Sequence, residues 1–574
     1  MALLAPSHPA PPERGPALLT RLKGLLATGT AGRGLTYGAL VVALIISLPA
    51  MAVIATLFDT PTASLSGLGQ SIMAELLTNS IILAVGTLAG VLVLGVSTAW
   101  LVTMCRFPGR EIFHWALILP LAVPAYVVAY AYTDFLHHPG PVQTLLREVT
   151  GWGAQDYWFP NIRSEGGAVF VFSFVLYPYV YLLARASFLE QSVCALEASR
   201  TLGQSAWGAF WKTALPLARP AIAAGAALAI METLADFGTV SHFGVRSFTT
   251  AIYQSWFSLG DRVLAGQLSA TLLGIVTLLI LVERLSRSGS TYEHTTSRLQ
   301  RLPDYELTGL RGLAAFAACA LPVLMGFALP LGILIYLNFV GGHDLFGSRY
   351  ITLTFNTFTL AGIAAVLAVL LALLMAYAVR LSRSPLARLA NRMTSLGYAI
   401  PGSVIAVGVL IPLANMDNAL DAWMRATFGI STGLILTGSI AGLIFAYLVR
   451  FMAVSINTVE ASLAKVTPNM DAAARSLGRS KLATLIEVHS PLMRGSLLTA
   501  GLIVFVDVVK ELPATLIMRP FNFDTLAIQA YRLASDERLA EASTASLMIV
   551  ATGLLPVIIL SRTIMASRPG GNRK

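Results

Sequence analysis

Charged residues are scarce in this sequence of 574 residues. They make up 12% of the chain against 56% for hydrophobic residues, which is too little charge to cover a soluble globule of this size. Cysteine is scarce as well: Cys105, Cys194 and Cys319 have no paired spacing, so neither a disulfide framework nor a cysteine metal cluster is indicated. The sequence also lacks the short alternating strands typical of a membrane β-barrel. These absences favour an α-helical membrane protein.

Apolar runs of about 20 residues fill most of the chain, and that is the length an α-helix needs to cross about 30 Å of hydrocarbon. We therefore predict an all-α integral membrane protein with about 12 transmembrane helices in two halves of six. The expected spans are 37–57, 77–104, 112–133, 166–189, 218–240, 263–283, 312–338, 354–379, 393–415, 432–452, 494–516 and 543–561.

The basic residues predict the orientation. Lys and Arg lie mainly at the ends of apolar runs on one side and do not form a single basic face, so nucleic acid is not an expected partner. This bias places both termini in the cytoplasm, and the Pro-rich N-terminal segment reads as an uncleaved tail. The predicted organisation is a tail (1–36), a first half of six helices (37–283), a cytoplasmic linker (284–311), a second half of six helices (312–562) and a C-terminal tail (563–574).

An internal repeat supports the division into halves. A shift of 275 positions aligns Gly203 with Gly478 and Pro216 with Pro491, and a shift of 277 farther upstream aligns the tripeptides 122–124 and 399–401. Because six spans is an even number, both halves enter the membrane from the same side, and the repeat is parallel.

One loop in each half carries the functional signal. In the first half Glu197, Ala198 and Ser199 are followed by Gly203 and then by Leu215 and Pro216; in the second half Asp471, Ala472, Ala473, Gly478 and Pro491 keep the Gly-to-Pro spacing. The acidic residue of the second copy stands one place early. Small residues suit a short helix that presents a smooth surface to another protein, Gly lets the chain turn, and Pro is expected to start the next membrane helix.

These loops resemble the EAA loop of binding-protein-dependent ABC importer permeases. The resemblance implies the type I importer permease fold, with each loop docking on one copy of an ATPase subunit at the cytoplasmic face and a periplasmic binding protein at the outer face of a bacterial inner membrane. No Gly-x-x-x-x-Gly-Lys-Ser/Thr pattern occurs, so ATP and Mg are expected on the partner, with no cofactor and no enzymatic activity on this chain.

Further segments resemble the ferric-iron permeases, which implies Fe(III) as the cargo: 124–130, 176–185, 231–238, 510–515 and 521–527. Related two-half permeases carry thiamine, polyamines or phosphonates, and these cargoes stay open. A secondary transporter is a second alternative that leaves the duplicated loops unexplained, and a membrane enzyme is a weaker one because no His or Cys constellation is evident.

Ionisable residues within apolar spans are expensive, at about 2.5 to 3.5 kcal/mol each at the helix centre, and mark candidate pathway or gate positions. Glu232 and Asp236 are four apart on the fifth expected span, and Asp507 and Glu511 are their repeat equivalents on the eleventh. Facing carboxylates could give a cation an acidic path. Alternatively, Lys510 pairs with Asp236 or Asp507 in a structural role, which we favour because a tight Fe(III) site would trap the ion.

Two other groups invite a metal-ligand interpretation that we do not favour. Tyrosines near the expected outer ends of spans three and four fit an aromatic belt better: Tyr126, Tyr130, Tyr132, Tyr177, Tyr179 and Tyr181. His137 and His138, adjacent in an outer loop, are expected to be solvated.

Overall fold

The computed structural model describes residues 30–60, 63–190, 199, 201, 203–287, 305–342, 347–382 and 384–566. Helices of the first half are α2 (Thr30–Ala55), η1 (Thr56–Phe58), α3 (Ala63–Met104), α4 (Arg110–Ala116), η2 (Leu119–Ala122), α5 (Ala125–Leu136), α6 (Pro141–Thr150), α7 (Glu165–Glu190), α9 (Ala206–Ala209), η3 (Phe210–Ala214), α10 (Leu215–Ala235), α11 (Gly238–His242), α12 (Phe248–Phe257) and α13 (Arg262–Arg287).

Helices of the second half are α14 (Gly309–Val323), η4 (Leu324–Ala328), α15 (Leu329–Gly341), α16 (Ser348–Ser382), α17 (Pro385–Thr394), η5 (Gly397–Ala399), α18 (Gly402–Phe428), α19 (Ile440–Leu463), α20 (Pro468–Ser476), α21 (Lys481–Thr484), η6 (Leu485–His489), α22 (Ser490–Val509), α23 (Pro513–Met518), α24 (Leu526–Ser535) and α25 (Leu539–Ala566). Two short strands, β1 (Cys105–Arg106) and β2 (Tyr305–Glu306), pair in parallel.

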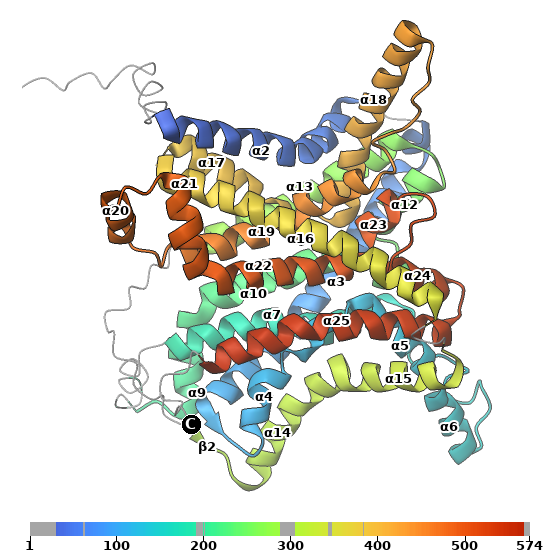
Figure 1. Ribbon diagram of the computed structural model, residues 1–574. Coiled ribbons are helices and arrows are strands. Elements are labelled where there is room, and N and C mark those ends of the chain that lie inside the picture. Colours follow the sequence, from blue (N-terminus) through green and yellow to red (C-terminus); the bar gives the residue numbers. More distant parts are fainter. Residues whose placement is uncertain are drawn as a thin grey trace, which may run out of the picture.

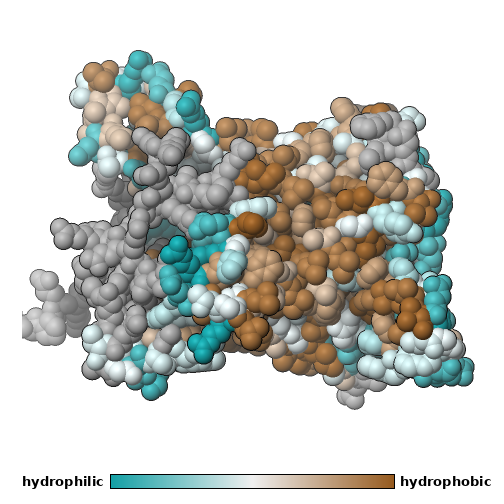
Figure 2. Space-filling view, turned by 90° about the horizontal axis from the view of Figure 1, so that it is seen from below, coloured by the Kyte–Doolittle hydropathy of each residue, from teal (hydrophilic) through white to brown (hydrophobic). Residues whose placement is uncertain are grey.

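The long helices run side by side as a bundle (Figure 1). Within the described residues, eleven helices are long and apolar enough to cross a membrane, and a bent helix pair supplies a twelfth span. Figure 2 shows the matching surface, a broad apolar band with hydrophilic residues gathered toward its ends. The predicted all-α membrane fold is confirmed, with spans in the expected number when the bent pair is counted as one.

Two expected spans, 112–133 and 393–415, are broken near the middle. The helices flanking residues 123–124 meet at 90°, and α18 begins only after Pro401. Pro124 and Pro401 both have extended backbone with ψ of 144° and 143°. Proline also disfavours helical geometry at the residue before it, so the helix stops there. The tripeptide that the repeat aligns is therefore the break itself, which hydrophobicity alone did not reveal.

The expected spans 218–240 and 494–516 also run across breaks. Helix α10 ends at Ala235 and α22 ends at Val509, each followed by a short helix, α11 or α23. Asp236 accepts backbone N–H groups of Thr239 and Val240, and Glu511 accepts those of Ala514 and Thr515. Both carboxylates cap the short helix that follows, so the prediction that they lie within a span was wrong.

The sequence predicted that Pro216 and Pro491 start membrane helices, and this prediction was wrong. Each lies within a continuous helical stretch, two residues after a π-helical turn, η3 or η6. Pro330 follows η4 in the same way. A proline lacks an N–H and its ring clashes with the carbonyl four residues earlier, and the wider π-turn accommodates both defects.

The first helix of each half packs on the other half. Helix α2 contacts α16, α17 and α18, whereas α14 and α15 contact α3, α4 and α5. The β1–β2 pair adds a further link, because it joins the end of α3 to the chain that leads into α14. The two six-helix halves defined along the sequence are thus interlocked in space.

The tyrosines expected in an aromatic belt lie in the core instead, and this prediction was wrong. Tyr126, Tyr130, Tyr132, Tyr177 and Tyr181 are at most 4% exposed. The third and fourth spans are interior helices, which hydropathy cannot distinguish from lipid-facing ones. The exposed aromatic side chains at the end of the bundle opposite α20 include Trp152, Trp158 and Trp423, which lie on or near α6 and the tip of α18.

Candidate functional site

Both loops with the Gly-to-Pro spacing lie at the same end of the bundle. Figure 1 shows α20 and α9 at this end, together with the start of α2 and the last turns of α25. Helix α6 and the tip of α18 lie at the opposite end. A parallel repeat requires this arrangement, since two halves inserted in the same direction present equivalent loops on one side.

The second loop forms the short helix α20, which presents small and apolar side chains outward. Ala472 and Ala473 are exposed, and Leu477, directly after the helix, is 80% exposed. Gly478 has φ of 75°, a left-handed conformation, and nothing lies within 4 Å of where its Cβ would be. Glycine is therefore needed here for its backbone and not for lack of space.

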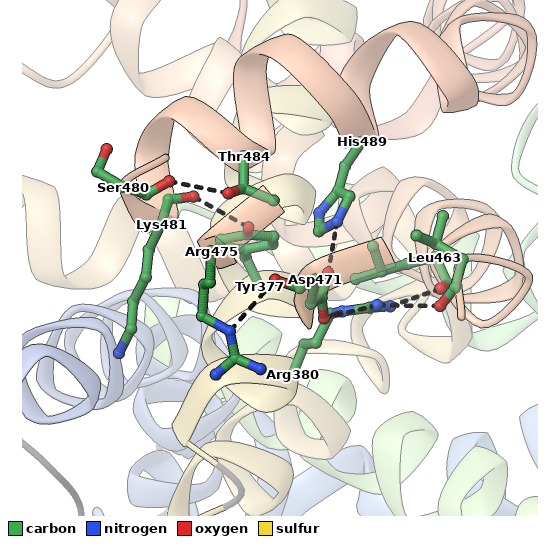
Figure 3. Close-up of polar contacts among 10 residues, drawn as sticks. Tyr377, Arg380, Leu463, Asp471, Arg475, Ser480, Lys481, Thr484 and His489 are labelled. Atoms are coloured by element: carbon green, nitrogen blue, oxygen red, sulfur yellow. Dashed lines mark hydrogen bonds and ion pairs between the residues drawn. The ribbon is translucent and has the colours of Figure 1, made fainter. Parts of the chain in front are cut away.

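Asp471 fastens α20 to the body of the second half (Figure 3). The Oδ2 atom of Asp471 accepts hydrogen bonds of 3.1 and 2.9 Å from Nε and Nη2 of Arg380, at the end of α16. Arg380 also donates to the carbonyls of Leu463 and Val466. Nε2 of the buried His489 lies 2.7 Å from Asp471 Oδ1, outside hydrogen-bond geometry, and contributes an ion pair only when the imidazole is protonated.

The first loop is described only in part, because Glu197 and Ala198 lie outside the described residues. Ser199 is buried, and its hydroxyl accepts a hydrogen bond of 3.2 Å from Thr213. Gly203 repeats the left-handed conformation of Gly478, with φ of 84° and no neighbour near its Cβ position. Leu215 and Pro216 follow η3 at the start of α10.

The charged anchor of α20 has no sequence counterpart in the first half. The repeat shift of 277 places Thr103 at the position of Arg380, and the shift of 275 places Leu196 at Asp471 and Ala214 at His489. None of these three residues carries a charge. The two loops therefore share the left-handed glycine and the Gly-to-Pro spacing, whereas the charged residues that anchor α20 are not repeated at the equivalent positions of the first half.

The four helix breaks meet at a cavity of about 130 Å³ in the centre of the bundle. Its lining includes Pro124 and Asp236 at two breaks of the first half and Glu511 at a break of the second. A Cβ at Gly238 would lie 2.6 Å from Tyr126 Cβ and 2.9 Å from Leu512 Cδ2, so glycine is required for the two halves to approach this closely.

Every ionisable residue that we selected from the spans lines this cavity, namely Glu232, Asp236, Asp507, Lys510 and Glu511. Lys510 pairs with Asp507 at 3.1 Å, one of the two partners we expected, although the pair lies within one half and does not join the halves. Asp236 and Glu511 are occupied as helix caps, as described above. No hydrogen bond or ion pair from a described residue reaches Glu232, which is half-buried.

Arg450 is a cavity residue that we did not select from the sequence. Its Nη1 lies 3.2 Å from Oε1 of Glu511, and both side chains are nearly buried, so the pair is desolvated. A Cβ at Gly402 would collide with both groups. The signal was present, since Arg450 is an ionisable residue near the end of the apolar run 432–452. Tyr179 and Tyr398 also line the cavity.

His137 and His138 are exposed, as expected for solvated side chains. Within the described residues no group of three or more His, Cys, Asp and Glu side chains could hold a metal ion.

Comparison with known proteins agrees with this architecture. Residues 92–288 match the family model described as "Binding-protein-dependent transport system inner membrane component". The fold and this match define the chain as a multi-pass, all-helical inner-membrane permease. The matched region contains the first of the two loops, and its similarity to this family agrees with the prediction made from the loop motif.

Several curated relatives extend the similarity beyond the matched region. The Fe(3+)-transport system permease protein FbpB 2 of Haemophilus influenzae is 28% identical over 509 residues, which cover 87% of this chain and 92% of that protein. The ferric transport system permease protein FbpB of Actinobacillus pleuropneumoniae is 25% identical over 495 residues, which cover 81% of this chain and 67% of that protein. The sulfate transport system permease protein CysW of Escherichia coli is 31% identical over 198 residues, which cover 33% of this chain and 65% of that protein.

Proposed function

We propose that this chain is the permease of an ATP-driven importer that moves ferric iron, delivered by a periplasmic binding protein, by alternating access. The observation that carries the proposal is the placement of two equivalent loops at one end of the bundle, with a cavity between the halves where the helices break. Rocking of the interlocked halves would open this cavity to one side at a time.

The proposal gives each loop a partner. The exposed small residues of α20 and the corresponding first loop would dock on two copies of an ATPase subunit that binds ATP and Mg. The positive-inside bias assigns this end, with both termini, to the cytoplasm. The binding protein would then dock at the opposite end, near α6 and the tip of α18.

The cavity favours a cationic cargo. Four carboxylates and two cationic side chains line it, a formal surplus of two negative charges. This balance suits Fe(III), thiamine or a polyamine, whereas a phosphonate would be repelled. The names of the relatives that match most of the chain favour Fe(III) among the cations. Because Asp236 and Glu511 cap helices, we assign the cargo contact to Glu232, a single carboxylate that can release the ion again.

The test is uptake of radioactive ferric iron by proteoliposomes that contain this permease, its cognate ATPase and its cognate binding protein. We expect uptake that requires ATP and all three components. Uptake without ATP or ATPase would indicate a secondary transporter instead. Uptake of thiamine, a polyamine or a phosphonate, but not of iron, would keep the importer and change the cargo.

A further inference from the structure

A long apolar groove opens on the first half between α3 and the continuous helix formed by α9, η3 and α10. Leu88, Leu92 and Val96 line the α3 side, and Ile222 and Ala226 line the α10 side. The groove has a volume of about 980 Å³, much larger than the central cavity. Both of these helices are membrane spans, so the groove faces hydrocarbon along most of its length.

One end of the groove carries a cation and two exposed tryptophans. Trp211, Leu215, Arg219 and Ala223 follow one another at intervals of four along the helix and form one stripe toward the groove, with Trp207 one turn earlier. Trp207 and Trp211 are 69% and 61% exposed. Tryptophan is enriched at headgroup level, so this end lies at the membrane surface on the side of the α20 loop.

Arg219 has no partner among the residues that the structure describes. Among the described residues no hydrogen bond or ion pair reaches its guanidinium, and none reaches the nearby exposed Lys212. Carboxylates are also missing from the described lining of the groove. An arginine without a described partner, in an otherwise apolar stripe at the membrane surface, attracts an anion, which a lipid phosphate supplies.

We propose that this groove binds one anionic phospholipid of the leaflet on the α20 side, with the phosphate on Arg219 and an acyl chain along α3. The length agrees. Leu88 and Leu101 are thirteen residues apart, about 20 Å along a helix, against about 15 Å for one leaflet of hydrocarbon. The site does not depend on the importer function and would stand with any cargo.

The second half supplies a matched comparison. The repeat places Arg494 at the position of Arg219, and Arg494 is likewise exposed. Around it, however, Ile486 replaces Trp211 and Glu487 replaces Lys212, and Glu487 forms an ion pair of 3.1 Å with Arg479. The second half thus lacks the tryptophan and has a carboxylate where the first half has the cationic Lys212, so we expect the lipid site in the first half alone.

The experiment uses native mass spectrometry of the full chain purified in mild detergent and titrated with dioleoylphosphatidylglycerol or dioleoylphosphatidylcholine. We expect tighter binding of phosphatidylglycerol by the wild type. Arg219→Gln should weaken it about fivefold or more, the factor that corresponds to about 1 kcal/mol for one cationic side chain near an anionic lipid. Arg494→Gln should leave it unchanged. Ala223→Trp, which keeps the cation and fills the groove, should also weaken binding.

Further controls distinguish a lost lipid site from a misfolded variant and from a site for a free anion. Arg219→Lys keeps the charge and should retain the lipid, which distinguishes loss of binding from misfolding; a monodisperse elution profile checks each variant. Equal losses in Arg219→Gln and Arg494→Gln, or equal binding of phosphatidylcholine by the wild type, would overturn the proposal. Glycerol phosphate that competes as well as phosphatidylglycerol would show a free-anion site without an acyl chain and would overturn it too.

Discussion

Replacing Asp471 by Asn should release the short helix α20 from the second half. The substitution keeps the size of the side chain and removes the negative charge that faces Arg380. Arg380 would then retain its hydrogen bonds to the carbonyls of Leu463 and Val466 but lose its ionic partner. Helix α20 would undock more often, because the charged contact joins it to α16.

The magnitude follows from burial. Breaking a fully buried ion pair costs about 3 to 5 kcal/mol, and an exposed pair is worth about 0 to 1 kcal/mol. The Arg380 and Asp471 side chains are 17% and 25% exposed, between these limits and nearer the first. We therefore expect a loss of about 2 kcal/mol in the free energy that keeps α20 docked, a factor of roughly 30 in the docking equilibrium.

Amide hydrogen exchange of the purified chain measures this equilibrium directly. Protection of the backbone amides of α20 should fall about 30-fold in Asp471→Asn, with the protection of α16 and α22 retained. Arg479→Gln is the matched control, because its ion pair with Glu487 is about half exposed on both sides and should contribute little. Unchanged protection of α20 in Asp471→Asn, or an equal loss in the control, would refute the anchoring role of the carboxylate.

Three further predictions follow from the geometry. Gly478→Ala should weaken association with the ATPase, because alanine in this left-handed conformation costs about 1 kcal/mol of backbone strain. Gly478→Asn should weaken association less, because asparagine tolerates the conformation. Pull-down yields of the ATPase that are equal for the two variants and the wild type would contradict this. Glu232→Gln should lower ferric uptake about tenfold with an unchanged melting temperature, whereas Asp236→Ala should cost about 1 to 2 kcal/mol of stability as a lost helix cap, measured by thermal melting. The bidentate pair between Arg163 and Glu537, at 2.7 and 2.8 Å, lowers the pKa of Glu537. The pair should contribute at most about 1 kcal/mol to the stability of the fold, because both side chains are partly exposed. This contribution should be present at neutral pH and be lost as the pH falls through the folded-state pKa of Glu537. Arg163→Gln should therefore remove this acid dependence of the melting temperature.

The sequence was sufficient for the broad architecture because bilayer thickness fixes span length. The ends of the helices were not well predicted, because hydropathy is averaged over a window of residues. Such an average does not detect a helix break that has apolar residues on both sides. Ala122, Val123 and Pro124 are all compatible with an apolar run, and only the proline marks the 90° bend. The repeat aligned this tripeptide in both halves, so that signal was available.

Side-chain partners were harder to predict than positions. All five ionisable residues selected from the spans line the central cavity. An ionisable side chain within an apolar run is costly in contact with lipid, so it usually faces the interior of the bundle. Their roles depend on the broken backbone: a carboxylate that appears to project from a helix face becomes a cap once the helix ends beside it. Asp236 and Glu511 changed from candidate cargo ligands to structural groups for this reason, while Glu232, inside α10, did not.

The early position of Asp471 has a physical explanation that the motif alone does not give. Successive residues on a helix are about 100° apart around its axis, so a shift of one place turns a side chain from one face toward another. Ala472, at the expected acidic position, is exposed on α20, whereas Asp471 faces Arg380 and His489. The displacement thus moves the carboxylate from the outward face to the inward face. A shift of the acid back to position 472 in Asp471→Ala/Ala472→Glu should therefore leave α20 without its anchor while adding a negative charge to the exposed surface, so exchange protection of α20 should fall as in Asp471→Asn. Full protection in this double variant would mean that the register of the acid is unimportant and that Arg380 holds the loop through the carbonyls alone.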